Sequence, residues 1–195
     1  MKNTLLIILF LFLYFVTINN DNKFLLILIP PIFLVILVYL YRNDIRQYNY
    51  LILVSDFPKI NKWTLFLLKY CIIIQGFTNA FFIILLGGSH SILSILHLYP
   101  IIPFYAIVIS PLIEEVIFRK IIFLNIRRKW GFWSGAILSS LLFAGLHFDL
   151  RVILGLFLSG ILYCWVYDKF KSIVPLYISH LLLNFVVILI ASLRT

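Results

Sequence analysis

The residues from 110 to 119 read S-P-L-I-E-E-V-I-F-R and place two carboxylates and a guanidinium inside an apolar run from 101 to 126. An ionised side chain at membrane depth costs several kcal/mol, so such residues are usually paired or functional. Glu115 and Arg119 are one helical turn apart and can form an ion pair. Glu114 lies about 100° around a helix from Glu115 and is left without a local partner. We therefore expect Glu114 to face polar residues on another segment.

Two later apolar runs each carry a polar residue pair with i,i+4 spacing. Phe143 and His147 lie in one run, and His180 and Asn184 lie in the last one. Hydrolysis of a peptide bond needs a base that activates water, donors for the oxyanion and an acid for the leaving amine. The spacing therefore predicts a catalytic site in which Glu114 and His147 hold the water while His180 and Asn184 offer donors.

The order E-E-x-x-x-R, F-x-x-x-H and H-x-x-x-N resembles the three-motif pattern of the CPBP family. That family contains the CAAX prenyl endopeptidases and the bacterial Abi-type, bacteriocin-associated intramembrane proteases. The resemblance covers about residues 110–185. It implies an intramembrane protease in which Glu114 and His147 activate water. It also implies that His180 and Asn184 stabilise the oxyanion. Glu115, Arg119 and Phe143 have supporting roles in this interpretation, with Arg119 orienting Glu115.

The same side chains raise the question of a metal. Two histidines and a glutamate match the donors of a catalytic zinc site, and the family has been called metalloproteases. Zinc held by Glu114, His147 and His180 is therefore one alternative. The sequence contains no H-E-x-x-H, and asparagine is an unusual zinc ligand. A metal-free mechanism without a cofactor is favoured.

The composition indicates an integral membrane protein of one domain, residues 1–195, with its motif-bearing helices in 101–193. The 195 residues are 64% hydrophobic, and the mean hydropathy is +1.11. The apolar runs are continuous rather than alternating, which predicts an all-α, polytopic transmembrane helix bundle. The net charge is +9, but the basic residues lie in short loops between apolar runs and do not form one basic face. Nucleic acid is therefore not an expected partner. Cys71 and Cys164 are expected to be small buried hydrophobes.

Seven apolar segments predict about seven spans, or six if the short first segment lies in the membrane interface. The Lys and Arg residues of the loops gather on one side of this arrangement, which predicts a cytoplasmic N-terminus and, with seven spans, an external C-terminus. A bacterial plasma membrane is the expected location. In the loop from 87 to 100, His90 and His97 are expected to be ordinary interfacial histidines. The segments are Thr4–Ile18, Phe24–Tyr41, Trp63–Leu86, Ile101–Ile126, Phe132–Phe148, Val152–Tyr167 and Ile173–Leu193.

Two other classes of function use buried polar residues in membrane helices. Transporters and proton relays do so, but the sequence has no inverted repeat. A non-catalytic bacteriocin-immunity or peptide-binding protein on the same scaffold is the second alternative. Because every motif position is present, the protease interpretation is favoured. Its expected partners are membrane lipid and a peptide or lipidated-protein substrate. Prenylation of that substrate and the oligomeric state stay open.

Overall fold

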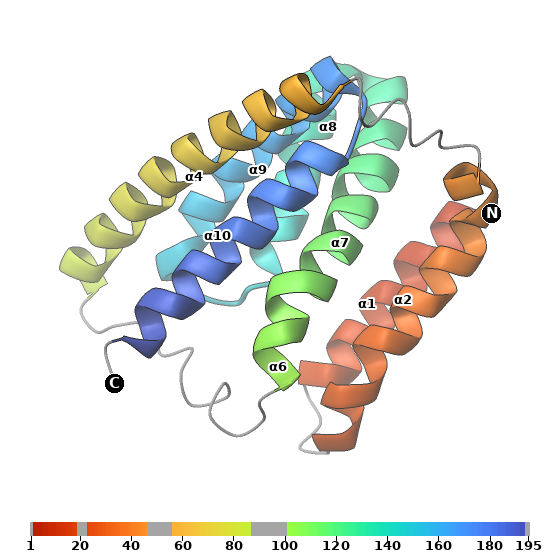
Figure 1. Cartoon of the computed structure of the whole chain (residues 1–195). Coiled ribbons are helices and arrows are strands. Elements are labelled where there is room, and N and C mark those ends of the chain that lie inside the picture. Colours follow the sequence, from red (N-terminus) through yellow and green to blue (C-terminus); the bar gives the residue numbers. More distant parts are fainter. Residues whose placement is uncertain (1, 19–22, 47–55, 87–100, 194–195) are drawn as a thin grey trace.

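The computed structural model describes residues 2–18, 23–46, 56–86 and 101–193, and these residues form helices without a strand. The all-α prediction is confirmed, whereas His90 and His97 lie outside the described residues. Figure 1 shows the helices packed side by side in a bundle. Along the chain they are α1 (Lys2–Ile18), α2 (Lys23–Arg46), α4 (Phe57–Leu86), α6 (Ile101–Phe104), η1 (Tyr105–Ile109), α7 (Ser110–Glu115), η2 (Val116–Phe123), α8 (Leu124–Gly145), α9 (Leu150–Phe170) and α10 (Val174–Ser192).

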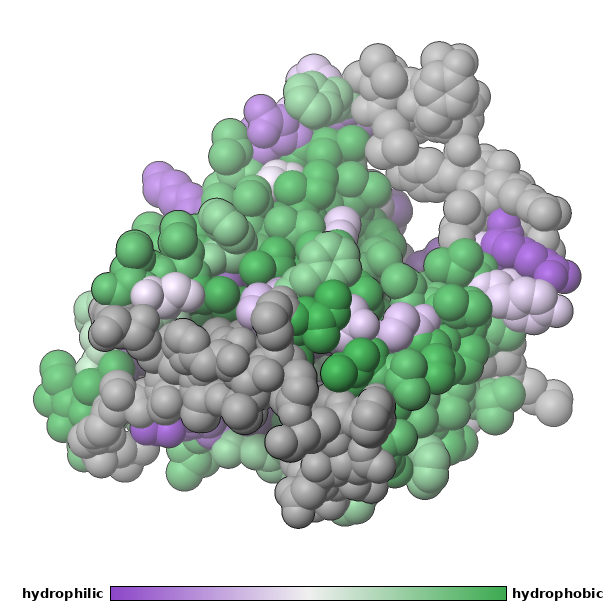
Figure 2. Space-filling view, turned by 60° about the horizontal axis from the view of Figure 1, so that its bottom comes forward, coloured by the Kyte–Doolittle hydropathy of each residue, from purple (hydrophilic) through white to green (hydrophobic). Residues whose placement is uncertain are grey.

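Four described helices are long and apolar enough to cross a membrane, so the count of seven spans is not confirmed. They are Phe57–Leu85, Ile101–Gly145, Leu150–Phe170 and Val174–Ser192, and two shorter apolar helices cover Asn3–Val16 and Ile27–Arg42. Many large apolar side chains on these helices are exposed. The coloured residues of the face in Figure 2 are accordingly mostly apolar. Such a surface suits contact with lipid chains, and the protein is an integral membrane protein.

The long helix Ile101–Gly145 folds back on itself at Gly131. A straight α-helix of its 45 residues would be about 67 Å long, more than twice the membrane core. Gly131 has φ 83° and ψ 175°, a backbone conformation that breaks the helix. Ser139 Oγ on the returning arm donates to the Phe118 carbonyl at 2.7 Å. A Cβ at Gly135 would lie 3.0 Å from the Arg127 nitrogen, so this glycine lets the two arms approach. The predicted break between Ile126 and Phe132 is therefore present.

Two π-helical turns, η1 and η2, flank the short helix α7 that carries both glutamates. At the end of η1 the Ser110 N–H bonds to the Tyr105 carbonyl five residues earlier, instead of to Ala106 four residues earlier. Pro111 follows at the start of α7 and has no N–H to donate. Single π-helical turns inside helices often mark functional sites. The widened turns decide where the side chains of α7 point.

The other helices enclose this distorted segment. Glycines let α9 pack closely, because a Cβ at Gly155 would lie 2.5 Å from Thr78 Oγ1 on α4 and one at Gly160 would lie 2.7 Å from Ser140 Oγ on α8. The α1–α2 pair packs on η2 through aromatic rings. Phe10 lies 5.9 Å from Phe118 between ring centroids. Helix α10 contacts α4, η1 and α7, which brings its polar residues to the glutamates.

Candidate active site

One cavity collects the polar residues of all three motifs. It offers about 70 Å³ to the centres of water-sized molecules, enough for a few ordered waters. Helices α4, α7, η2, α8, α9 and α10 and the turn after α8 supply its walls. The cavity is lined by Gln75, Glu114, Glu115, Arg119, Phe143, His147, Leu156, Ser159, Tyr163, His180, Leu183 and Asn184. The seven residues singled out in the sequence are thus brought together.

Glu115 and Arg119 form the predicted ion pair in the fully buried part of the site. Arg119 Nε lies 3.2 Å from Glu115 Oε2, and the two side chains are 0% and 1% exposed. The guanidinium lies over the rings of Phe143 and Tyr163, at 4.9 and 5.7 Å from their centroids. His180 Nδ1 donates to the other oxygen, Glu115 Oε1, at 2.9 Å. Each oxygen of Glu115 therefore faces a partner inside the protein, Oε1 facing His180 and Oε2 facing Arg119.

Glu114 is more accessible than its neighbour, with a side chain that is 17% exposed. Its Oε1 accepts a hydrogen bond of 2.5 Å from Ser110 Oγ, and its Oε2 lies 3.7 Å from His180 Nε2. The expectation that Glu114 lacks a local partner was wrong, because Ser110 lies one turn earlier on the same face of the helix. Glu114 nevertheless lines the cavity, and its Oε2 accepts no hydrogen bond from Ser110.

His180 joins the two carboxylates through the two nitrogens of one ring. Glu115 fixes the Nδ1–H, so Nε2 faces Glu114 and the cavity. The ring is held edge to face by Phe143, with centroids 5.9 Å apart, and is flanked by Tyr163 at 6.0 Å. The two glutamates point in different directions from the helix, and the imidazole spans the gap between them. This arrangement orients His180 for proton exchange at Nε2.

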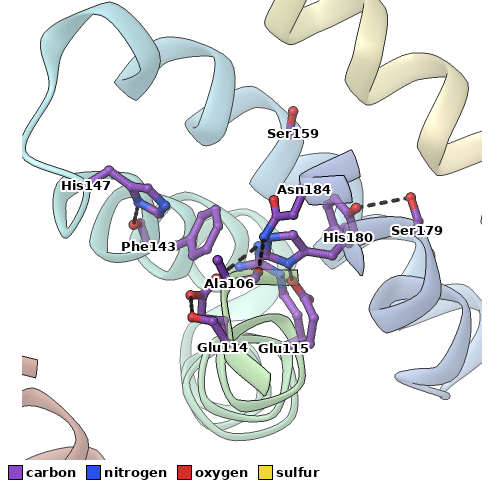
Figure 3. Close-up of polar contacts among 12 residues, drawn as sticks. Ala106, Glu114, Glu115, Phe143, His147, Ser159, Ser179, His180 and Asn184 are labelled. Carbon is purple, nitrogen blue, oxygen red and sulfur yellow. Dashed lines mark hydrogen bonds and ion pairs between the residues drawn. The ribbon is translucent and has the colours of Figure 1, made fainter. Parts of the chain in front are cut away.

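His147 lies on the other side of Phe143 from His180, as Figure 3 shows. Its Nδ1–H donates to the Phe143 carbonyl at 3.0 Å, which leaves Nε2 as the nitrogen with a free lone pair. The rings of His147 and Phe143 are 5.1 Å apart between centroids. The Tyr14 hydroxyl on α1 donates to the carbonyl of Leu146, the residue before His147. Within the described part of the chain, His147 forms no direct ion pair with Glu114.

Asn184 lies one turn after His180 and reaches the backbone of η1. Its Nδ2 donates to the Ala106 carbonyl at 2.8 Å, the contact drawn in Figure 3. The side chain therefore lines the cavity with an amide that is already bonded to the protein.

Comparison with known proteins shows what the motif-bearing part of the chain is similar to. Residues 95–186 match the model of a family described as "Type II CAAX prenyl endopeptidase Rce1-like". Over 104 residues the chain is 34% identical to the Bacillus subtilis (strain 168) protein named "Putative membrane peptidase YdiL". The matched region carries all three of the motifs by which the chain resembles the CPBP family. The alignment with that relative covers 52% of this chain and 42% of the relative, and no solved structure matches.

The histidines and the glutamate of the cavity are also possible zinc ligands by donor type. Both histidines have Nδ1 bound to an oxygen and Nε2 directed away from it, as is common for ligating histidines. However, no three His, Cys, Asp or Glu side chains of the described residues lie close enough together to hold a metal ion. Glu114, His147 and His180 do not form a ligand set in this arrangement.

Two polar residues that contribute to the site, Ser110 and Gln75, were not predicted from the sequence. Ser110 could have been found by its i,i+4 spacing to Glu114. Gln75 on α4 donates to Ser159 Oγ at 3.3 Å across the cavity wall. Its signal was an amide inside the apolar segment from 63 to 86, where Asn79 is the other one. Gln75 also lies outside the matched residues 95–186, so the N-terminal half contributes to the same cavity.

Proposed function

We propose that this chain is an intramembrane endopeptidase that hydrolyses a peptide bond in a membrane-associated peptide or protein. The observation that carries the proposal is that two adjacent carboxylates, Glu114 and Glu115, lie in different environments. Glu115 is buried against Arg119, whereas Glu114 opens into a cavity that admits water. One carboxylate is thus bound within the protein and the other is available for chemistry. The match to a CAAX endopeptidase family supports the same interpretation.

Glu114 acts as the general base in this proposal. Ser110 holds Oε1, so Oε2 is the oxygen that takes a proton from a water in the cavity. The water oxygen attacks the carbonyl carbon of the substrate and forms a tetrahedral intermediate. His147 binds the same water through Nε2 from the other side of the cavity. General-base catalysis of this kind contributes typically about 10²–10⁴-fold to a rate.

His180 completes the proton transfers. Its Nε2 lies beside Glu114, so the proton taken from water passes to the leaving amine from Glu114 directly or through this nitrogen. The C–N bond breaks as the amine receives that proton, and the acyl fragment leaves as a carboxylic acid. When Nε2 carries a proton it also donates to the oxyanion. Glu115 supports the step by holding Nδ1.

The proposed topology has seven crossings, with the N-terminus in the cytoplasm of a bacterial cell and the active site within the membrane. Basic loops that the sequence assigns to one side do meet in space. Arg127 at the start of α8 lies 2.8 Å from Asp168 near the end of α9, and Lys171 bonds to the same carboxylate. The proposed substrates are a lipidated protein with a CAAX-type C-terminus and an unmodified membrane peptide.

Cleavage in ¹⁸O-labelled water tests the proposal. Full-length protein in lipid vesicles is given a farnesylated peptide that ends in a CAAX sequence and, separately, an unmodified transmembrane peptide. Wild-type protein should release a fragment with ¹⁸O in its new carboxyl group. Glu114→Gln should not do so, whereas Asp56→Asn, which removes a carboxylate paired with Lys59 at the start of α4, should act like wild type. Binding of both peptides without any cleavage would favour the non-catalytic, peptide-binding alternative.

A further inference from the structure

The H-x-x-x-N pair of α10 holds the kinked helix at two points. His180 bonds to Glu115 on α7, and one turn later Asn184 Nδ2 bonds to the backbone carbonyl of Ala106 in η1. The second contact is 2.8 Å long, a good length for an N–H···O hydrogen bond. A side-chain amide that bonds a helix carbonyl is unusual, because helix carbonyls normally have a donor in their own helix.

The Ala106 carbonyl has lost both donors that a helix could supply. In an α-helical turn its donor would be the N–H of Ser110, but that N–H bonds to Tyr105 instead. In a π-helical turn its donor would be the N–H five residues later, and residue 111 is a proline. Asn184 supplies the missing donor.

We propose that Asn184 is a positioning residue whose bond to Ala106 stabilises the π-helical turn before α7. A π-helical turn contains one more residue than an α-helical turn, and each residue turns a helix by about 100°. If η1 returned to the α-helical register, the parts of the helix on its two sides would rotate relative to each other. The directions of Glu114 and of its partner Ser110 toward His180 therefore depend on the turn that Asn184 completes.

The effect of Asn184 on hydrolysis rests on the proposed function, but its hydrogen bond to Ala106 does not. Pro111→Ala gives residue 111 an N–H. The Ala106 carbonyl then has a backbone donor in either register, from residue 111 in the π-helical form or from Ser110 in the α-helical form. Removal of the Asn184 side chain should accordingly lower the stability of the protein when residue 111 is proline and change it little when residue 111 is alanine.

A double-mutant cycle on the full-length protein in detergent tests this coupling. Reversible unfolding is measured for wild type, Asn184→Ala, Pro111→Ala and the double variant. A fully buried carbonyl without a donor shifts the folding equilibrium by about 5- to 150-fold. Because the contact of Asn184 with Ala106 is partly buried, Asn184→Ala should cause a shift near the lower end of that range when Pro111 is present. In the Pro111→Ala background the shift should be at most about two-fold. Equal shifts in both backgrounds would overturn the proposal.

Ser179→Ala is the matched control. It removes a different polar contact of α10, the buried 3.1 Å bond to the Tyr163 hydroxyl. Because this bond does not involve η1, its effect should be the same in the wild-type and the Pro111→Ala backgrounds. A Ser179→Ala effect that also disappears in the Pro111→Ala background would show that the coupling is a general loosening of α10 and would overturn the specific role of Asn184.

Hydrolysis of the farnesylated peptide supplies the readout that separates positioning from oxyanion binding. Asn184→Ala should lower kcat with little change in KM, and its fold-loss should shrink in the Pro111→Ala background. An undiminished loss of kcat there, with no coupling in stability, assigns Asn184 to the oxyanion and overturns the proposal. If stability is coupled while wild type cleaves neither peptide, the structural bond stands and the proposed protease function fails.

Discussion

Replacement of Glu115 by glutamine should destabilise the protein strongly, although the side chain keeps its shape. Arg119 has a fully buried guanidinium whose nearest negative charge is Glu115, at 3.2 Å. At an effective dielectric constant of about 20, two unit charges at that distance attract by about 5 kcal/mol. Removing one partner of a buried ion pair typically costs about 3–5 kcal/mol, because the other charge stays buried and uncompensated.

Several contacts would remain in the Glu115→Gln variant. The glutamine oxygen can still accept from His180 Nδ1, and the rings of Phe143 and Tyr163 still flank the guanidinium. We therefore expect the lower end of the range, about 3 kcal/mol, which is roughly a 150-fold change in the folding equilibrium.

The assay combines the amount of folded protein in the membrane with the unfolding midpoint in detergent. Glu114→Gln is the matched control, since it removes the same charge one residue earlier from a side chain that is 17% exposed. Its stability should stay close to wild type. Glu115→Leu combined with Arg119→Met should recover much of the lost stability, because an apolar pair replaces the buried charges. Equal stability of Glu115→Gln and Glu114→Gln would refute this reasoning.

Three further predictions concern the site and the topology. His147→Ala should reduce hydrolysis by about 10²–10⁴-fold, because the water loses its hydrogen bond to His147. The level of folded protein should stay normal, since the imidazole is not fully buried. Unchanged cleavage would remove His147 from the mechanism. Activity should survive a strong chelator without stoichiometric zinc in elemental analysis, and a loss that zinc specifically restores would contradict this. Reporter fusions after Lys129 and Lys171 should report cytoplasm and one after Thr195 should report the outside; a cytoplasmic C-terminus would contradict seven crossings.

The sequence was most informative where polar residues interrupt apolar runs. Because lipid offers no hydrogen bonds, buried groups such as Glu115, Arg119 and His180 must find one another, and their convergence could be predicted. The break near Gly131 could be predicted as well, since an uninterrupted helix would be too long for the membrane.

Other features depend on backbone detail that residue spacing does not contain. The π-helical turn before α7 changes which carbonyls have donors, and only Pro111 hints at it in the sequence. Both glutamates contact His180, each at a different nitrogen of the imidazole ring. The sequence did not predict this shared partner, because Glu114 and Glu115 are about 100° apart around the helix. Gln75 could not be assigned to the site, because its helix carries none of the three motifs.

The most direct test of the central claim separates substrate binding from chemistry in Glu114→Gln. Affinity for the farnesylated peptide and for the unmodified transmembrane peptide is measured first, and cleavage is then followed in a single turnover with saturating enzyme. Glu114→Gln should bind the wild type's preferred peptide with wild-type affinity and cleave it about 10²–10⁴-fold more slowly. Cleavage at the wild-type rate by correctly folded Glu114→Gln would show that Glu114 is not the base that activates the water.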